Sequence, residues 1–227
     1  MPRETLDREI RELKDDILTL ASMVEKNIAD SMTALKSRNT QLSREVFHSD
    51  QRVNQKRFDI ESATLLVIAT QQPMAHDLRL LAAILEVAGE LERMGDYAKG
   101  NAKINVLLED TLFEAPILEL EAMSESVLSM LHRAVVAFNK EDEKSAREIP
   151  EEDEKVDEMY KDVYRKLIQL MIQSPDKIDH ANYYMWAAHN LERTADRVSN
   201  ICERTIFVVT GELLEVATND EDTADLS

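Results

Sequence analysis

Glycine, proline and cysteine are all scarce in this sequence. Its 227 residues include only 4 glycines and 5 prolines. A β-sandwich or barrel needs many tight turns, which draw heavily on those two residues, so the composition argues against an all-β fold. The single cysteine, Cys202, rules out an internal disulfide and is consistent with a reducing compartment.

The sequence also lacks a long apolar run. Its longest uncharged stretch, residues 62–76, is too short for a membrane-spanning helix and includes Thr, Gln and Pro. Residues 1–10 carry charges throughout and contain no apolar segment like that of a signal peptide. We therefore expect any contact with a membrane to be only peripheral.

Basic charge is a third deficit. The chain has 45 acidic against 27 basic residues, which gives a formal net charge of −18. The phosphates of DNA and RNA would repel such a chain, so nucleic acid is not an expected partner. Free phosphate would be repelled as well, whereas cations and basic protein surfaces would be attracted.

Helix-forming sequence is what the chain has in abundance. Its apolar side chains recur every three or four positions, which is typical of amphipathic helices that turn one face to a core. In the second stretch, Ile60 and Leu65 both belong to the stripe that should face this core. Six helices are expected, with apolar stripes in residues 6–35, 42–68, 78–95, 120–135, 142–170 and 186–206.

Turn residues mark the ends of these helices. The first and second helices separate at Asn39-Thr40. The second ends at Gln72-Pro73, because the residue before a proline avoids helical geometry, and Pro73 then suits the start of the third. The fifth helix is expected to run unbroken from about Asp142, and Gly211 to end the sixth.

The two halves of the chain repeat each other. At a spacing of 103 residues Asp50 matches Asp153, and at a spacing of 100 residues 91–93 match 191–193. A loop between the second and third helices of each unit can absorb the difference. We therefore expect an all-α fold of two tandem antiparallel three-helix bundles. The predicted bounds are residues 1–112, residues 113–216, and a disordered acidic tail at 217–227.

Repeated acidic pairs are the main candidate site. Four pairs of oxygen-bearing side chains lie one helical turn apart, two in each repeat: Asp50 with Asn54, Glu92 with Asp96, Asp153 with Asp157, and Glu192 with Asp196. Like charges so placed repel each other, and a bound cation would turn this repulsion into coordination. Carboxylate and amide oxygens are hard ligands that suit Mg²⁺, Mn²⁺, Ca²⁺ and iron in carboxylate-rich sites.

Two other interpretations of these pairs stay open. They could be solvated faces without any ligand, whose carboxylates pair with Arg93, Arg193 and Arg197. They could instead belong to a carboxylate-bridged metalloenzyme, such as an oxidase or hydrolase. The sequence has no glycine-rich phosphate loop, and four of its five histidines lie in no Glu-x-x-His motif, so we do not expect an enzyme.

Three stretches resemble characteristic blocks of the PhoU family of phosphate-uptake regulators. Residues 71–80 read QQPMAHDLRL and resemble that family's Gln-Pro-x-x-x-Asp-Leu-Arg signature between its second and third helices. Residues 91–96 read LERMGD and resemble its Leu-Glu-Arg-Ile-Gly-Asp block, and residues 191–201 resemble the second copy of that block. The resemblance covers about residues 5–215 and includes the repeat.

This resemblance implies a fold of two three-helix bundles side by side. It also implies a cytoplasmic adaptor, without catalytic activity, that regulates phosphate uptake and intracellular phosphate homeostasis. Family members negatively regulate the phosphate-starvation two-component signal through a phosphate-sensing histidine kinase, and they restrain the high-affinity phosphate ABC transporter. By resemblance, the expected partners are that kinase, the transporter ATPase and a second copy of the chain, as a homodimer.

The resemblance also implies metal binding, because some family members hold iron or zinc clusters, or other divalent cations, in these motifs. Carried over, the first site would use Asp50, Asn54, Glu92 and Asp96. The second would use Asp153, Asp157, Glu192, Asp196 and Asn200. The family usually has asparagine at the position of Asn200, but the first copy here has Gly100. The first site is therefore expected to bind metal more weakly, or to take a water in place of the amide.

Overall fold

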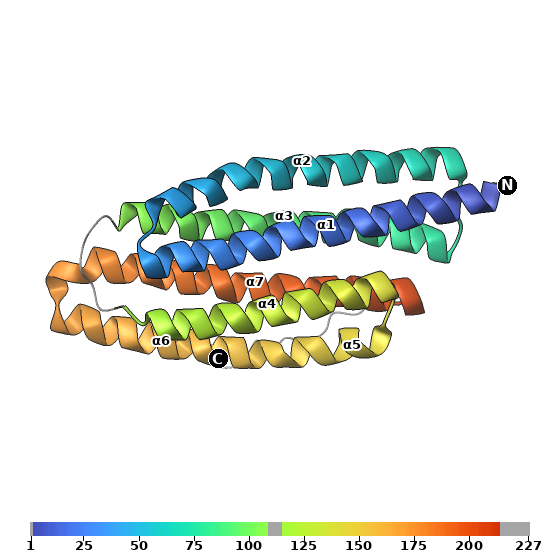
Figure 1. Cartoon of the computed structure of the whole chain (residues 1–227). Helices are drawn as coiled ribbons and strands as arrows, with labels where there is room; N and C mark the ends of the chain where they lie inside the picture. The colour runs from blue at the N-terminus through green and yellow to red at the C-terminus, as the bar shows by residue number, and fades with distance from the viewer. Residues whose placement is uncertain (1, 109–114, 214–227) are drawn as a thin grey trace, which may run out of the picture.

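The structure is a computed structural model, and it describes residues 2–108 and 115–213. Within those residues every regular element is helical, which confirms the predicted all-α fold (Figure 1). The elements are α1 (Pro2–Ser37), α2 (Thr40–Gln71), α3 (His76–Leu107), α4 (Ile117–Lys140), α5 (Glu143–Glu148), the 3₁₀ turn η1 (Ile149–Glu152), α6 (Asp153–Gln173), the 3₁₀ turn η2 (Pro175–Lys177) and α7 (Ile178–Thr210). The predicted tail at 217–227 lies outside the described residues.

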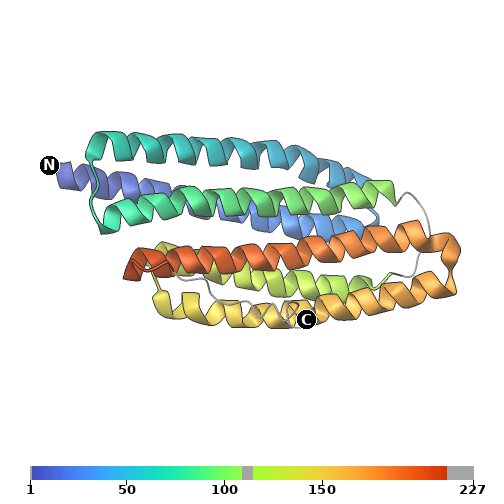
Figure 2. The same cartoon turned by 180° about the vertical axis from the view of Figure 1, so that it is seen from behind.

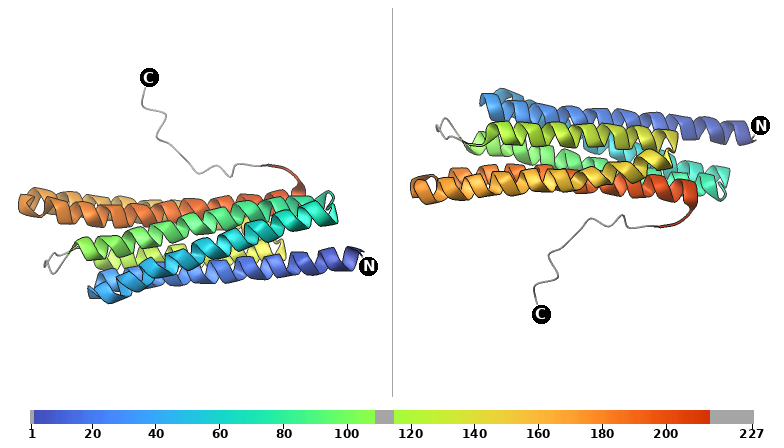
Figure 3. Two further views of the ribbon diagram at one scale, coloured as in Figure 1. Left: turned by 90° about the horizontal axis from the view of Figure 1, so that it is seen from above. Right: turned by 90° about the horizontal axis from the view of Figure 1, so that it is seen from below.

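Successive helices run antiparallel and form two bundles side by side (Figures 1 and 2). The first bundle contains α1, α2 and α3, and the second contains α4, the broken helix α5–α6, and α7. α1 and α3 face α4 and α7, while α2 and α6 lie on opposite outer sides (Figure 1). Views from above and below show that both bundles share one long axis (Figure 3). In the described ranges, no helix combines the length and apolar character that crossing a membrane requires.

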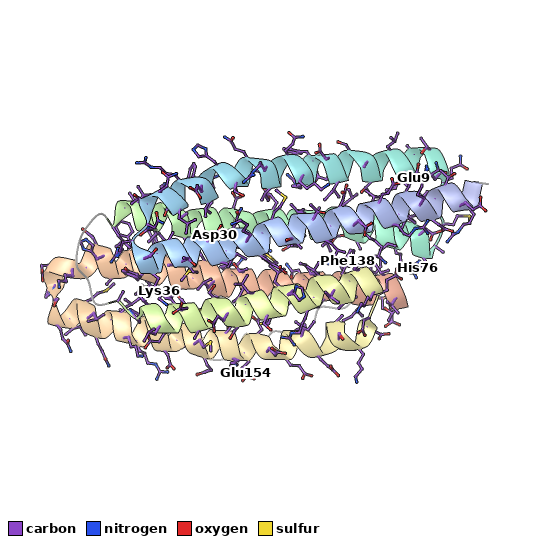
Figure 4. All side chains as sticks on the ribbon, in the orientation of Figure 1. Glu9, Asp30, Lys36, His76, Phe138 and Glu154 are labelled. Atoms are coloured by element: carbon purple, nitrogen blue, oxygen red, sulfur yellow. The ribbon has the colours of Figure 1, made fainter. Side chains whose placement is uncertain are left out.

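Most of the predicted apolar stripes lie between the helices, but Leu78 and Trp186, the first residues of the stripes predicted for the third and sixth helices, are 44% and 53% exposed and do not belong to the core. In α1 the residues spaced by three or four positions are all buried: Leu6, Ile10, Leu13, Ile17, Leu20, Val24, Ile28 and Leu35. Burying each large apolar side chain contributes about 1.5–3 kcal/mol, and this is the main force that holds the bundles together. Figure 4 shows the contrast between Phe138, which is buried inside, and Glu154, which points outward from α6.

Leu65 is an exception to the predicted stripe of α2. It is 57% exposed and its neighbour Leu66 is 63% exposed, whereas Thr64 and Val67 fill this turn of the core. Thr64 tolerates burial because its Oγ1 donates a hydrogen bond of 2.7 Å to the backbone carbonyl of Ile60. The expectation that Leu65 belongs to the core is therefore wrong, and its side chain lies on the outer face of α2.

Helix ends follow the predicted turn residues at most positions. Asn39 caps α2 through its side chain, and Gly211 ends α7 in a left-handed conformation with φ of 80°. The sequence suggested that the third helix begins at Pro73, but in the structure it begins at His76. Gln72 has a positive φ of 49°, so the backbone turns away from helical geometry before Pro73 and needs three further residues to regain it.

The predicted fifth helix is broken, which corrects the expectation of one continuous element. α5 ends at Glu148, and the 3₁₀ turn η1 leads into α6 at Asp153. Pro150 has no backbone N–H, and its ring collides with the preceding turn, so an α-helix cannot continue through it undisturbed. The equivalent position in the first repeat is Phe47, and α2 passes through it without a break.

α3 and α7 form the most extensive contact between the two bundles and run in opposite directions (Figure 2). Asn200 Nδ2 donates to Glu90 Oε2 at 3.1 Å, and Asn190 Nδ2 donates to Asn101 Oδ1 at 2.8 Å. Positions 90 and 190 are equivalent in the repeat, as are 100 and 200. Asn101 lies one residue beyond position 100, so an approximate twofold axis relates the two contacts with a shift of one residue. A Cβ added at Gly100 would lie only 3.0 Å from Asn190 Nδ2, and glycine avoids that close approach.

Candidate functional site

The first acidic cluster consists of Asp50 and Asn54 on α2 and of Glu92 and Asp96 on α3. Asp50 is only 3% exposed, and its Oδ2 accepts a hydrogen bond of 3.3 Å from Asn54 Nδ2. Burial, followed by the negative charge of Asp96, raises the pKa of Glu92, while the positive charge of Arg57 opposes this rise. The structure thus brings the four residues predicted for the first site into one neighbourhood.

Lys99 enters this first cluster from α3. Its Nζ donates a hydrogen bond of 2.7 Å to Asp50 Oδ2 and lies 3.8 Å from Asp96 Oδ1. The same ammonium lies 5.2 Å from the centre of the Phe47 ring, within cation–π distance. Its hydrogen bond to Asp50 is the largest of the causes that raise the pKa of Lys99. An internal cation therefore neutralises part of the first cluster.

The second acidic cluster consists of Asp153 and Asp157 on α6 and of Glu192 and Asp196 on α7. Asp153 is 5% exposed, and burial, followed by the charges of Asp196 and Asp157, raises its pKa to about 7. Burial, followed by the same two aspartates, also raises the pKa of Glu192 to about 7. The four side chains act on one another electrostatically, so the structure brings this predicted set together as well.

The second cluster has weaker internal compensation. Asp153 Oδ1 is buried and has no hydrogen-bond partner; Asp50 Oδ1 shares this state, but Asp50 has a lysine bonded to its other oxygen. Arg193 Nη1 lies 2.9 Å from Asp196 Oδ2, so the expected pairing with an arginine occurs at this position. His189 Nδ1 lies 3.1 Å from Glu192 Oε2, but the geometry is that of an ion pair without a hydrogen bond. Both contacts join residues of α7 to each other, so neither gives the buried Asp153 Oδ1 a partner.

Asn200, the fifth residue predicted for the second site, contacts the other bundle. Its amide nitrogen donates to Glu90, as described above, and Arg197 Nη1 lies 3.5 Å from the same Glu90 oxygen. The arginine pairing expected for Arg197 thus involves a residue of α3 and no member of the second cluster. The role of Asn200 as a metal ligand stays a prediction.

The two clusters differ in how well they suit a cation. Both offer hard oxygen ligands. As the side chains stand, no three Asp, Glu, His or Cys residues in the described part of the chain are placed to hold one ion. The second cluster still has the right donors and an unsatisfied buried oxygen on Asp153, so it suits a cation after side-chain rotation. The first suits one poorly, because Lys99 already bonds its most buried carboxylate.

Lys99 is the residue of this site that the pattern of acidic pairs did not reveal. It follows Asp96 by three residues and carries the opposite charge, so a search for paired acids passes over it. The repeat nevertheless contains the signal. At a spacing of 100 residues, Lys99 is equivalent to the uncharged Ser199, and this difference separates the two copies of the motif.

Comparison with known proteins identifies relatives over almost the whole chain. The family model described as PhoU domain matches residues 17–104 and 120–205. The phosphate-specific transport system accessory protein PhoU homolog of Streptococcus pneumoniae is 32% identical over 214 residues, which cover 94% of this chain and 99% of the relative. The phosphate-specific transport system accessory protein PhoU of Escherichia coli K12 is 30% identical over 213 residues, 94% of this chain and 88% of the relative.

Solved structures agree with these sequence relatives. The crystal structure of the phosphate transport system regulatory protein PhoU from Streptococcus pneumoniae has a TM-score of 0.85 at 32% identity and covers 93% of this chain and 100% of that one. The crystal structure of PhoU from Pseudomonas aeruginosa has a TM-score of 0.86 at 30% identity, and the match covers 91% of this chain and 99% of that one. The two domain matches, the similar length and the shared architecture agree with one another. The chain therefore belongs to the PhoU family.

Proposed function

We propose that this protein regulates phosphate uptake and intracellular phosphate homeostasis as a cytoplasmic adaptor. In this proposal it negatively regulates the phosphate-starvation two-component signal and restrains the high-affinity phosphate ABC transporter. The observation that carries the proposal is the pair of PhoU domains, which together account for most of the chain. Its relatives are named as accessory or regulatory proteins of phosphate transport, which supports a role in regulating that transport.

The outer face of α2 supports a role in binding other proteins. Its apolar patch consists of Phe58, Leu65 and Leu66, which are 51%, 57% and 63% exposed. Exposed apolar groups that gather on one helix are typical of interaction surfaces. At the position equivalent to Leu66, α6 has the exposed polar residue Gln169, so the two outer helices offer different surfaces. We therefore propose α2 as a contact surface for the transporter ATPase or the kinase.

Binding measurements with purified partners test this adaptor function. We expect the protein to bind the transporter ATPase, or the cytoplasmic region of the histidine kinase, with an affinity that depends on phosphate concentration. Leu66→Asp should weaken binding at least tenfold, because it places a charge in the apolar patch. Gln169→Asp introduces the same side chain on α6 and serves as the matched control. Absence of binding to both partners, at high and at low phosphate, would rule the adaptor function out.

We further propose that a divalent cation binds to the second acidic cluster and makes the regulation dependent on metal. Asp153, Asp157, Glu192 and Asp196 would hold it. When bound, the ion would neutralise carboxylates on both α6 and α7 and so fix the two helices relative to each other. The unsatisfied, buried Asp153 oxygen and the crowding of negative charge support this proposal.

A carboxylate-bridged metalloenzyme is the alternative. The carboxylates that α6 and α7 direct to one place favour it, because hard oxygen ligands from two helices are what a carboxylate-bridged metal centre uses. Turnover of oxygen or of a phosphoester by the metal-loaded protein, abolished by Glu192→Ala, would establish this alternative. Metal-loaded protein that turns over neither substrate, yet binds its partners, would favour the adaptor.

A further inference from the structure

The two acidic clusters are equivalent in the repeat except that Asn54 of the first corresponds to Asp157 of the second, and the equivalence also fails at two neighbouring positions. Lys99 on α3 corresponds to Ser199 on α7, and Phe47 on α2 corresponds to Pro150 in η1. In the first cluster these two side chains contact each other, since the Lys99 ammonium lies over the Phe47 ring. The second repeat therefore lacks both the cation and the aromatic ring that helps to hold it.

The position of the Lys99 ammonium is that of a bridging ion. It contacts a carboxylate from each of two helices, Asp50 of α2 at 2.7 Å and Asp96 of α3 at 3.8 Å. Asp50 is almost fully buried, whereas the Lys99 side chain is 31% exposed, so the lysine closes the cluster from its open side. A divalent cation bound to Asp50 would have to displace this ammonium, because two positive charges on the same oxygen repel each other strongly.

The second cluster contains no such group at the equivalent place. Ser199 is 3% exposed, and its Oγ has no hydrogen-bond partner. Asp153 Oδ1 is likewise buried without a partner. Asp50 Oδ1 in the first cluster is unsatisfied too, so the contrast lies in the cation: Asp50 Oδ2 accepts a hydrogen bond from Lys99, whereas Ser199 brings no positive charge to Asp153. Unsatisfied buried oxygens are costly, and a cation is the ligand that carboxylate and hydroxyl oxygens attract most strongly.

We propose that Lys99 is a built-in cation that closes the first acidic cluster, so that this protein binds a divalent metal ion only at the second. The metal content of the second cluster rests on the proposed function, whereas the closure of the first does not. Replacing Lys99 should open a site that is blocked in the native chain. In this chain, then, the twofold repeat of the motif does not imply two metal sites.

The test counts bound Mn²⁺ by electron paramagnetic resonance, which distinguishes free from bound ions. The variants are Lys99→Ser, which copies the second repeat, and Lys99→Arg, which keeps the positive charge and is the matched control. We expect Glu192→Ala to abolish the Mn²⁺ binding of the native chain and Glu92→Ala to leave it unchanged. Lys99→Ser should gain one additional Mn²⁺, which Glu92→Ala removes in the combined variant. Lys99→Arg should gain none.

Two results would overturn the inference. One is a loss of Mn²⁺ in Glu92→Ala while Lys99 is present, because the first cluster would then be open in the native chain. The other is a Lys99→Ser variant that folds but binds no more Mn²⁺ than the native protein. If the native chain binds no Mn²⁺ and Lys99→Ser binds one, the closure by Lys99 is upheld, and the metal part of the proposed function fails.

Thermal unfolding gives a second, independent measurement. Lys99→Ser should lower the Tm in the presence of a chelator, because it leaves the buried Asp50 without its cation. Added Mn²⁺ should restore the lost stability in Lys99→Ser and have no such effect on Lys99→Arg. A Tm of Lys99→Ser that Mn²⁺ does not raise would contradict the inference. If Lys99→Ser does not fold, Lys99→Gln replaces it in both measurements.

Discussion

The two acidic clusters are built on equivalent helices from equivalent motifs, and they balance their charge in opposite ways. In the first, Lys99 donates a hydrogen bond to Asp50 and supplies a compensating charge from within the chain. In the second, Ser199 occupies that position, and burial with mutual repulsion raises the pKa values of Asp153 and Glu192 to about 7. The same backbone arrangement therefore holds carboxylates that repel one another in the second repeat, and carboxylates partly neutralised by a lysine in the first.

The comparison teaches that an acidic motif cannot be judged from its own residues. Glu92 and Asp96 have the same spacing as Glu192 and Asp196, yet the two clusters differ in Lys99 against Ser199 and in Asn54 against Asp157, and both differences make the second cluster more negative. A few side chains thus decide whether the carboxylates of a cluster have a positively charged partner from within the chain. The following predictions test this difference, beginning with the largest expected effect.

Removal of the paired carboxylate should be the most damaging change. Asp50→Asn takes away the nearer of the two carboxylates that contact Lys99 and leaves only Asp96 at 3.8 Å. It should lower the free energy of unfolding by about 1.5–3 kcal/mol, the usual contribution of a hydrogen bond between charged groups. Urea denaturation with a chelator present measures the effect. Asp59→Asn, on the same helix but exposed, is the control. An Asp50→Asn variant as stable as the native chain would remove the contrast between the clusters.

The pH dependence of stability should report the second cluster. Asp153 and Glu192 have pKa values of about 7 in the folded state against ordinary values of 3.8 and 4.5. The folded state therefore binds more protons than the unfolded state between about pH 4 and pH 7, so stability should rise as the pH falls through that range. From pH 8 to pH 5 we expect a gain of about 2 kcal/mol in metal-free protein, after allowance for solvent screening.

The double variant Asp153→Asn/Glu192→Gln is the control for this pH effect. It should lose most of the gain between pH 8 and pH 5, because neither side chain then titrates. Chemical denaturation at several pH values measures both proteins. A native chain whose stability does not change over this range, or a double variant with the same pH dependence as the native chain, would contradict the raised pKa values.

Neutralising one carboxylate of the second cluster should stabilise the protein, in contrast to Asp50→Asn. At pH 8 without metal, Asp153→Asn removes a buried negative charge and should raise the free energy of unfolding by about 1–2 kcal/mol. The same variant should lose stabilisation by Mn²⁺. Parallel urea titrations of Asp50→Asn and Asp153→Asn compare the two clusters directly, and changes of equal sign would show that both clusters are balanced in the same way.

The smallest effect should come from the aromatic ring beside Lys99. Phe47→Ala removes the cation–π contact and should cost about 0.5–1 kcal/mol, because Phe47 is half exposed. In a Lys99→Ser background the same substitution should cost less. A double-mutant cycle from thermal or urea unfolding measures this coupling. A cost that is the same in both backgrounds would mean that the ring stabilises the protein without acting on Lys99.

Much of the fold could be predicted because it depends on local periodicity. The stripe of α1 is fully buried, as its spacing indicates, and the repeat places three acidic pairs and the Asp50–Asn54 pair at equivalent positions. The position of Leu65 was predicted wrongly because Leu65 and Leu66 are apolar neighbours that suggested a core position. The residue that faces the core in this turn is instead Thr64. The sequence shows Pro150, which can break a helix, but the apolar pattern on both sides of it suggested that the helix continues.

The less predictable part of the site depends on contacts between distant segments. Lys99 reaches Asp50 across 49 residues, and Asn200 reaches Glu90 across 110. Helical periodicity tells which face a residue occupies, but not which side chain of the neighbouring helix lies opposite. Only the comparison of one repeat with the other could have drawn attention to Lys99, because its counterpart differs in charge.

The approximate twofold axis between α3 and α7 has a consequence for how such a molecule can change over generations. In a homodimer of a single three-helix unit, every substitution occurs twice, once on each side of the axis. A lysine that closed one cluster would then close both. Joining the two units in one chain removes this constraint, so a lysine at 99 and a serine at 199 can coexist. With both units in one chain, the charge of each cluster can be set independently of the other.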